Sequence, residues 1–181
     1  MFEELIRQRR SIRRFIDRPV ESEKIDLLME AALRAPSSRG LKPWEFVVVD
    51  DRTQLAALAG CKPHGAGFLG HAPLGIVVCA DPEQSDVWVE DGAIAVTFIQ
   101  LMAVELGLGS CWIQVRKRSH ADGSPARNHI ARCLALPDRL EVEAMIAIGY
   151  PAEPKAGHAR EGLLFDRIHG NRFGTPYVFK G

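Results

Sequence analysis

The stretch Asp91-Gly92-Ala93-Ile94-Ala95-Val96-Thr97-Phe98-Ile99-Gln100-Leu101-Met102-Ala103-Val104-Glu105-Leu106 is the most hydrophobic segment of the chain, and Gly107 follows it. Its apolar side chains go nearly all the way round the helix that their spacing predicts. A helix that is apolar on every side is buried, so this segment predicts the centre of the fold. In a domain of this size it also predicts a subunit interface.

Four further segments have the composition of β-strands, being rich in β-branched and aromatic residues. The predicted strands are Pro43–Val49, Leu74–Ala80, Cys111–Val115 and Val142–Gly149. Helical patterns occur at residues 1–10, 22–34, 54–59 and 124–136, and the last predicted elements are a short helix at 163–169 and a strand at 176–179. This interleaving predicts an α+β or α/β sandwich around one central sheet, as a single domain spanning residues 1–181.

The composition argues against several function classes. Lys plus Arg number 23 and Asp plus Glu number 23, so no global field draws the chain to nucleic acid or to a membrane surface. No apolar run is long enough to span a membrane, and the amino terminus lacks a signal-peptide pattern. The four widely spaced cysteines therefore predict buried, reduced thiols, and we expect a cytoplasmic protein.

An arginine cluster lies near the amino terminus, in the segment Arg9-Arg10-Ser11-Ile12-Arg13-Arg14-Phe15. No acidic block elsewhere in the sequence neutralises it. Guanidinium groups bind phosphate through paired hydrogen bonds, and a serine hydroxyl adds a donor, which favours a phosphorylated small molecule as the ligand. The alternative is a solvated basic helix end, because arginine is favoured in the last turn of a helix. The segment alone leaves both interpretations open.

The segment Gly65-Ala66-Gly67-Phe68-Leu69-Gly70 matches the dinucleotide pattern G-x-G-x-x-G. That pattern binds a pyrophosphate only between a strand and a helix, whereas here a predicted helix precedes it and a predicted strand follows. We therefore reject a dinucleotide-binding fold and interpret the segment as a glycine-rich loop near the mouth of a site. Cys61, His64 and His71 lack the fourth ligand that structural zinc requires, so no metal site is predicted.

A second basic run, Arg116-Lys117-Arg118-Ser119-His120, follows the third predicted strand. It has no interleaved aromatic side chains for stacking bases, which argues against a nucleic-acid site. We interpret it as a solvated loop or as a surface that attracts an anionic co-substrate. In the strand before it, Trp112 and Gln114 alternate and share a face, for which core packing is the simpler interpretation.

Five motifs occur in order across nearly the whole chain. They are Arg9–Arg13, Ala35–Ser38 with Pro43–Val49, Gly107–Ile113, Ile148–Pro151 and His169–Phe173. Together they resemble the FMN-dependent nitroreductase family with strong specificity. The resemblance implies a homodimeric α+β fold, a three-layer α/β/α sandwich around a central mixed sheet. It also implies two FMN sites at the dimer interface, each built from both subunits, with the helix at residues 91–106 in the dimer core.

The resemblance also assigns roles to residues that match the family's motifs. Arg9, Arg10 and Ser11 would hold the phosphate and ribityl chain, and Arg13 would face the flavin N1–O2 edge, where a cation eases reduction. Other implied cofactor-binding residues are Pro36, Ser37 and Ser38 from the partner subunit, Arg39 and Gly40 beside them, Trp112, Ile113 and Gln114 along the isoalloxazine, and Lys155 and Arg160 at the phosphate.

The activity that the resemblance implies is a ping-pong oxidoreduction. NAD(P)H would give hydride to flavin N5, and the flavin would then reduce a nitroaromatic, a quinone or a similar electron-poor acceptor, so no catalytic side chain is required. The family often has Asn and Gln where this chain has Gly40 and Lys42. These departures leave open a non-catalytic FMN-binding or redox-sensing protein, or an enzyme of the same fold with another reductive activity.

Overall fold

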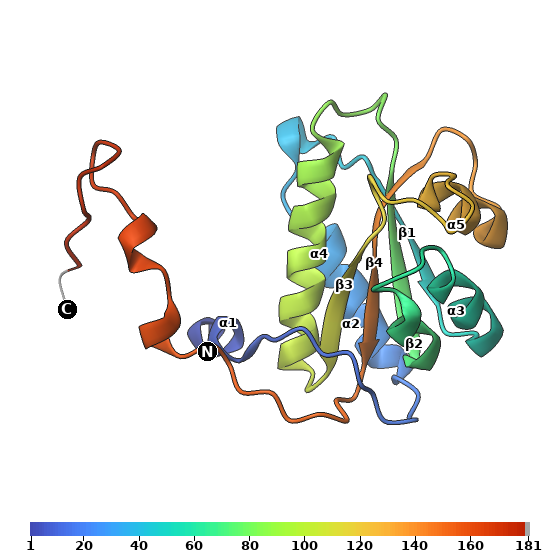
Figure 1. Ribbon diagram of the computed structural model, residues 1–181, viewed down its shortest axis with the longest axis horizontal. Coiled ribbons are helices and arrows are strands. Elements are labelled where there is room, and N and C mark those ends of the chain that lie inside the picture. The colour runs from blue at the N-terminus through green and yellow to red at the C-terminus, as the bar shows by residue number, and fades with distance from the viewer. Residues whose placement is uncertain (180–181) are drawn as a thin grey trace.

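The computed structural model describes residues 1–179 and has a four-stranded sheet at its centre (Figure 1). The strands are β1 (Trp44–Val49), β2 (Leu74–Ala80), β3 (Gly109–Gln114) and β4 (Glu141–Gly149). They lie in the order β1-β2-β4-β3, and each pairing is antiparallel. The four predicted strands are confirmed within two residues at each end. We expected a mixed sheet, but among residues 1–179 parallel pairing is confined to one bridge between Ser11 and Ser110.

Helices cover both faces of the sheet and give the three layers that we expected (Figure 1). They are α1 (Phe2–Gln8), α2 (Ser22–Leu33), α3 (Arg52–Ala59), α4 (Trp88–Glu105) and α5 (Ala126–Leu134). The pair α2 and α4 lies on one face, and α3 and α5 lie on the other. The α+β fold is therefore confirmed. In the part of the chain that the structure describes, no helix has the length and apolar character needed to cross a membrane.

The two middle strands, β2 and β4, carry the core. Every residue of β2 is buried, as its uninterrupted apolar sequence predicts. Successive side chains point to opposite faces, so Ile76 and Ile146 pack beneath α2 and α4, whereas Val77 and Met145 pack beneath α3 and α5. Two hydrophobic clusters thus fix the sheet between the helical layers, and β3 is left as an edge strand.

Helix α4 is the element that the hydrophobic segment at residues 91–106 predicts, and it begins three residues earlier, at Trp88. Its inner face is buried on the sheet and α2. Its outer face is also apolar, yet Ile94 and Phe98 are each 38% exposed. An apolar groove of about 390 Å³ lies over this face, lined by Phe2, Leu5, Ala31, Thr97, Phe98, Leu101, Met102 and Glu105. Within one chain, α4 is therefore buried on one face only.

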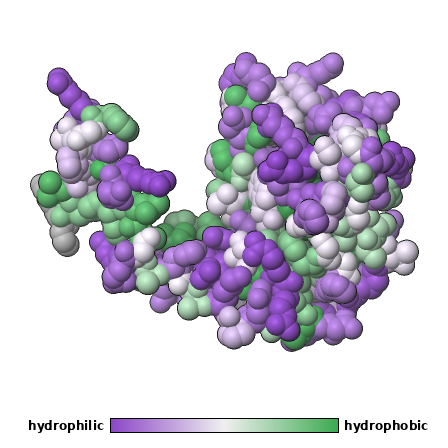
Figure 2. All heavy atoms as spheres, in the orientation of Figure 1, coloured by the Kyte–Doolittle hydropathy of each residue, from purple (hydrophilic) through white to green (hydrophobic). Residues whose placement is uncertain are grey.

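The segment from Pro151 to Phe179, here called the carboxyl-terminal arm, extends away from the sheet and its helices, here called the body (Figure 1). Hydrophobic side chains gather on the arm (Figure 2), and Leu163 and Phe173 are 48% and 93% exposed. The predicted helix at 163–169 is reduced to short 3-10 turns, and the predicted strand at 176–179 to a single bridge between His169 and Pro176. The arm therefore lacks a core of its own.

Candidate functional site

The segment that follows α1 lies along the outer edge of β3. Helix α1 ends at Gln8, so the arginine cluster lies beyond the helix rather than in its last turn. The backbone N–H of Ile12 donates to the Ser110 carbonyl at 3.0 Å. Gly109 permits this approach, because a Cβ atom there would lie 2.8 Å from the Ile12 side chain. The arginines are therefore not a solvated basic helix end, since they lie beyond α1 on a segment that is hydrogen-bonded to β3.

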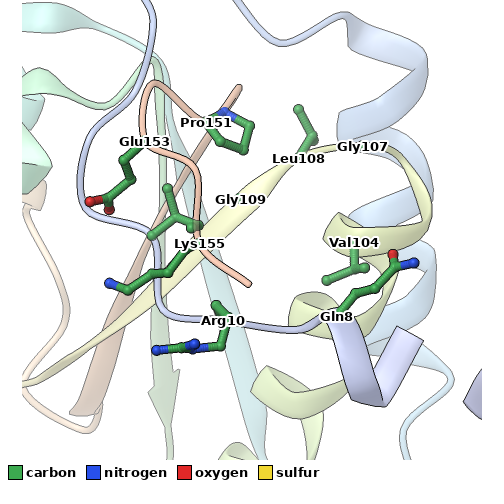
Figure 3. A pocket seen from close by; sticks show the side chains of 10 residues that line it. Gln8, Arg10, Val104, Gly107, Leu108, Gly109, Pro151, Glu153 and Lys155 are labelled. Atoms are coloured by element: carbon green, nitrogen blue, oxygen red, sulfur yellow. The ribbon is translucent and has the colours of Figure 1, made fainter. Parts of the chain in front are cut away.

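The start of the arm crosses the same segment and adds a cation. Lys155 Nζ donates to the Ser11 carbonyl at 2.9 Å, and the Arg10 guanidinium donates to the Ala156 carbonyl. In Figure 3 the Arg10 and Lys155 side chains extend toward the same side, while Gln8 lies across a cavity of about 220 Å³. The structure thus brings Arg10, Ser11 and Lys155 together, as the family resemblance implies, although Lys155 is far away in the chain.

Positive charge dominates this edge of the sheet. Burial raises the pKa of the Cys111 thiol. The positive charge of Arg13 lowers this pKa, as do a hydrogen bond with Ser11 and the charges of Lys155 and Arg9. These cations therefore gather around the first half of β3. Within residues 1–179, none of the cations of this edge takes part in an ion pair; they are Arg9, Arg10, Arg13 and Lys155.

Glu153 is the acidic residue of this edge, and no pattern in the sequence singles it out. Its Oε1 accepts a hydrogen bond from the backbone N–H of Arg13 at 2.8 Å, and this bond holds the pKa of Glu153 below its usual range. The carboxylate therefore fixes the backbone of the arginine segment instead of pairing with a guanidinium. Only the folded chain brings these two residues together, since 140 positions separate them.

Trp112, Ile113 and Gln114 form the second half of β3. The Trp112 Nε1–H donates to Gln114 Oε1 at 2.9 Å, which confirms that the two side chains share a face. Trp112 is half-buried and packs against the cluster beneath α2 and α4. Ile113 points to the opposite face, where it is buried beneath α3 and α5. A ligand on the Trp112 face could therefore meet only the backbone of Ile113.

The loop Cys61–Gly70 spans both halves of this edge. The Arg13 guanidinium carbon lies 5.8 Å from the centre of the Phe68 ring, and Lys62 Nζ donates to the Gln114 carbonyl at 2.7 Å. Helix α3 precedes the loop and strand β2 follows it, which is the reverse of a dinucleotide-binding turn. The loop thus closes one side of the site, as a glycine-rich loop at its mouth is expected to do.

The loop Pro36–Gly40 lies at the other end of α4. The Ser38 backbone N–H donates to Asp91 Oδ1 at 2.8 Å, and the Ser37 hydroxyl accepts from the Lys42 N–H at 3.0 Å. Arg39, with φ 52°, and Gly40, with φ 69°, are exposed in left-handed conformations. Helix α4 continues from Asp91 to Glu105, fourteen residues further on, or roughly 21 Å at 1.5 Å per residue. Within residues 1–179, no hydrogen bond or ion pair joins this loop to the arginine segment.

Arg160 also lies apart from the other predicted residues. Its guanidinium carbon is 4.8 Å from the centre of the Phe165 ring, and it lines a separate cavity of about 340 Å³ together with Arg7 and Gly157. Within one chain, Arg160 therefore contributes to the arm and not to the cluster around Arg10. Its predicted role at the phosphate stays a prediction.

Fold and site together define an α+β protein with a cationic strand edge, suited to an anionic ligand held against β3. The sequence matches the nitroreductase family over residues 6–64 and 59–150, and the chain belongs to that family. It is 35% identical over 174 residues to an Archaeoglobus fulgidus protein provisionally named NADH dehydrogenase/NAD(P)H nitroreductase, covering 93% of this chain and 97% of that one.

Two solved structures are similar over nearly their whole length. An FMN-dependent nitroreductase from Clostridium difficile R20291 has a TM-score of 0.92 and 48% identity, with 93% of this chain and 98% of that chain covered. A provisionally named nitroreductase from Desulfovibrio desulfuricans, solved in complex with FMN, has a TM-score of 0.76 and 31% identity, with 95% and 97% covered. The family resemblance read from the five motifs is therefore confirmed.

Proposed function

We propose that this FMN-dependent oxidoreductase takes hydride from NAD(P)H and reduces an electron-poor acceptor, such as a nitroaromatic or a quinone. The observation that carries the proposal is the cationic edge of β3. Within residues 1–179, Arg9, Arg10, Arg13 and Lys155 gather there without a paired carboxylate, along the strand that carries the half-buried Trp112. A phosphorylated, aromatic cofactor needs this combination of charge and flat apolar surface.

The donor chemistry of the edge fits FMN. A phosphate monoester is bound best by guanidinium and ammonium groups, which Arg9, Arg10 and Lys155 supply, and the Ser11 hydroxyl adds a neutral donor. Bound FMN would supply a ring that accepts hydride from NAD(P)H and returns electrons to the acceptor. Arg13, an exposed cation of the same segment, would stabilise negative charge on that ring.

The other residues of the site position the ligand and need not move a proton. The hydrogen bond between Trp112 and Gln114 fixes both side chains on one face of β3. Burial raises the pKa of Cys111, which keeps the thiol neutral and unreactive. No acid–base pair is required, because orientation and charge are what the protein contributes.

We further propose that the active form is a homodimer. The arm exposes apolar side chains that its own body does not cover, and the outer face of α4 offers an apolar groove of about 390 Å³. Both features call for a second copy of the chain. In that dimer, Pro36, Ser37 and Ser38 of one copy would complete the flavin site of the other, since in their own copy about 21 Å of helix α4 lies between their neighbour Asp91 and the Glu105 end of the helix.

Anaerobic reduction of the FMN-loaded protein tests the activity. We expect the yellow absorbance band to bleach when NADH or NADPH is added, and to return when a quinone or a nitroaromatic compound is supplied. Persistence of the band with both nucleotides would contradict the reductase proposal. It would favour the alternative, a non-catalytic FMN-binding protein of the same fold.

A further inference from the structure

A second cationic cluster lies at the far end of β3, and we name it the distal cluster. It consists of Lys62, Arg116, Lys117 and Arg118. Within residues 1–179, none of the four takes part in an ion pair, although arginines elsewhere on the surface, such as Arg34 and Arg139, pair with glutamates. Clustered charge of one sign raises the local concentration of anionic ligands.

The turn that carries three of these cations is ordered. The Arg118 N–H donates to the Val115 carbonyl at 3.0 Å, and the Ala126 N–H donates to the Arg118 carbonyl at 2.9 Å. Lys117 has φ 58°, a left-handed conformation that is unfavourable for a non-glycine residue. Such local strain clusters at ligand-binding sites. Lys117 and Arg118 are exposed, so both are free to meet a ligand.

Neighbouring groups hold the base of the distal cluster in place. The Arg116 guanidinium carbon lies 5.7 Å from the centre of the Trp88 ring on α4. Burial raises the pKa of Glu143 on β4, Arg116 lowers it and Glu90 on α4 raises it further, so Glu143 lies near Arg116. Within residues 1–179, neither glutamate forms an ion pair with Arg116. Arg116 is therefore the half-buried support of the turn.

The distal cluster adjoins the second half of β3. Lys62 Nζ donates to the Gln114 carbonyl at 2.7 Å. Burial lowers the pKa of Lys62, and Arg118 adds to this effect, so the two cations lie close together. Ser11 lies level with Ser110, four strand steps before Gln114, so roughly 13 Å at about 3.3 Å per residue separates the Arg9–Ser11 part of the arginine segment from the distal cluster. One mononucleotide carries one phosphate, so a second ligand is needed for the second cluster.

We propose that the distal cluster binds a phosphate group of NAD(P)H, with Lys117 and Arg118 as the contacting cations. This inference rests on the proposed function, because it assumes that NAD(P)H is the reductant. Both nicotinamide dinucleotides carry a pyrophosphate, and NADPH carries an additional 2′-phosphate, so either group provides the shared chemistry. The cluster lies where a ligand stacked beside Trp112 and Gln114 would extend beyond the strand.

The test compares two double variants of the FMN-loaded protein. The first is Lys117→Asn/Arg118→Ser, in which asparagine tolerates the left-handed conformation at position 117. The matched control is Arg34→Ser/Arg132→Ser, which removes the same charge from exposed positions elsewhere. Calorimetry measures the Kd of ADP-ribose and of 2′-phospho-ADP-ribose, and anaerobic kinetics measures kcat and KM for NADH and NADPH. The calorimetric readout does not depend on turnover.

We expect the first variant to raise Kd and KM about 10-fold, with kcat within about twofold of wild type and the control unchanged. A rise for NADPH and 2′-phospho-ADP-ribose alone assigns the 2′-phosphate, and a rise for both nucleotides assigns the pyrophosphate. Unchanged Kd and KM for both nucleotides would overturn the inference. If neither NADH nor NADPH bleaches the wild-type protein, the proposed function is refuted instead. Calorimetry distinguishes this result from failure of the inference, because it measures binding without turnover.

Discussion

The body and the carboxyl-terminal arm place their apolar side chains in opposite surroundings. In the body, β2 and β4 are covered on both faces, and residues such as Ile146 are completely buried. In the arm, Leu163, Leu164 and Phe173 remain open to solvent, and aromatic contacts such as Phe165 with Phe179 at 5.0 Å are internal to the arm. The two regions belong to one chain, yet only the body has a core.

This contrast assigns the regions different roles. Burial of the strands supplies the stability of the body, since each large apolar side chain removed from water contributes about 1.5–3 kcal/mol. The arm gains little from folding on its own chain, so its apolar residues are expected to stabilise an assembly. The flavin site that we propose lies where the two regions meet, because Lys155 and Ala156 at the base of the arm contact Ser11 and Arg10 of the body.

Removal of the part of the arm beyond Gly157 gives the largest expected effect. A chain that ends at Gly157 keeps Lys155 but loses the exposed apolar segment, so we expect a folded monomer that binds FMN at least about 100-fold more weakly. Light scattering measures the mass, and quenching of flavin fluorescence measures the affinity. A shortened chain that stays dimeric and yellow would show that the arm has no part in assembly.

Truncation of one apolar side chain in each region separates their contributions to stability. Ile146→Ala removes a fully buried side chain, and we expect it to lower the free energy of unfolding by about 2–5 kcal/mol. Phe173→Ala removes a side chain that is 93% exposed, and we expect a change within about 0.5 kcal/mol at concentrations where the chain is monomeric. Urea unfolding measures both, and equal losses would contradict the contrast.

Glu143 gives the body a pH dependence. It is 3% exposed, and within residues 1–179 its Oε2 has no hydrogen-bond partner. Burial raises its pKa to about 8, while Arg116 lowers it and Glu90 raises it. Between the unfolded pKa of about 4.5 and the folded value, the folded chain binds the extra proton. Stability from this residue is therefore complete below about pH 4.5 and is lost as pH rises through about 8.

Glu143→Gln removes that dependence, because the amide does not ionise. The difference in unfolding free energy between variant and wild type should shift in favour of the variant by on the order of 4 kcal/mol from acid to pH 9. Glu161→Gln in the arm controls for the loss of one carboxylate. Denaturant titrations measure the free energy of unfolding across this pH range. If it changed with pH in the same way for the variant and the wild type, the account would be contradicted.

The smallest expected effect concerns one glycine in each region. A Cβ at Gly109 would lie 2.8 Å from the Ile12 side chain, so Gly109→Ala should cost about 1–3 kcal/mol and also weaken FMN binding. A Cβ at Gly162 meets nothing within 4 Å, so Gly162→Ala in the arm should be nearly neutral. Thermal unfolding of the two variants gives the comparison, and a neutral Gly109→Ala would contradict the fixed contact between Ile12 and β3.

Much of the body could be predicted from hydrophobic pattern, because its strands and α4 are long apolar runs. Pairing direction could not be predicted, since nothing local distinguishes the antiparallel order that the chain adopts. The outer face of α4 was expected to be buried, and one copy of the chain leaves it exposed. The arm was harder still, because its residues have no local partners to impose the predicted helix and strand.

The candidate site was predictable in part. Clustered charge pointed to Arg9, Arg10 and Arg13, and the alternation of Trp112 with Gln114 placed both on one face. Asp91 and Glu153 were missed as site residues, because each accepts a hydrogen bond from a backbone N–H that is distant in sequence. Asp91 accepts from Ser38, and Glu153 accepts from Arg13. Such pairings arise only when the fold brings the two segments together.

The affinity for FMN of the triple variant Arg9→Ala/Arg10→Ala/Arg13→Ala tests the central claim most directly. Flavin fluorescence measures it beside a control, Arg34→Ala/Arg52→Ala/Arg132→Ala, that removes equal charge from outside the edge of β3. Each charge-assisted hydrogen bond to the cofactor is worth about 1.5–3 kcal/mol, so we expect the variant to bind at least about 100-fold more weakly, with the control unchanged. Wild-type affinity in the triple variant would contradict a flavin site at this edge.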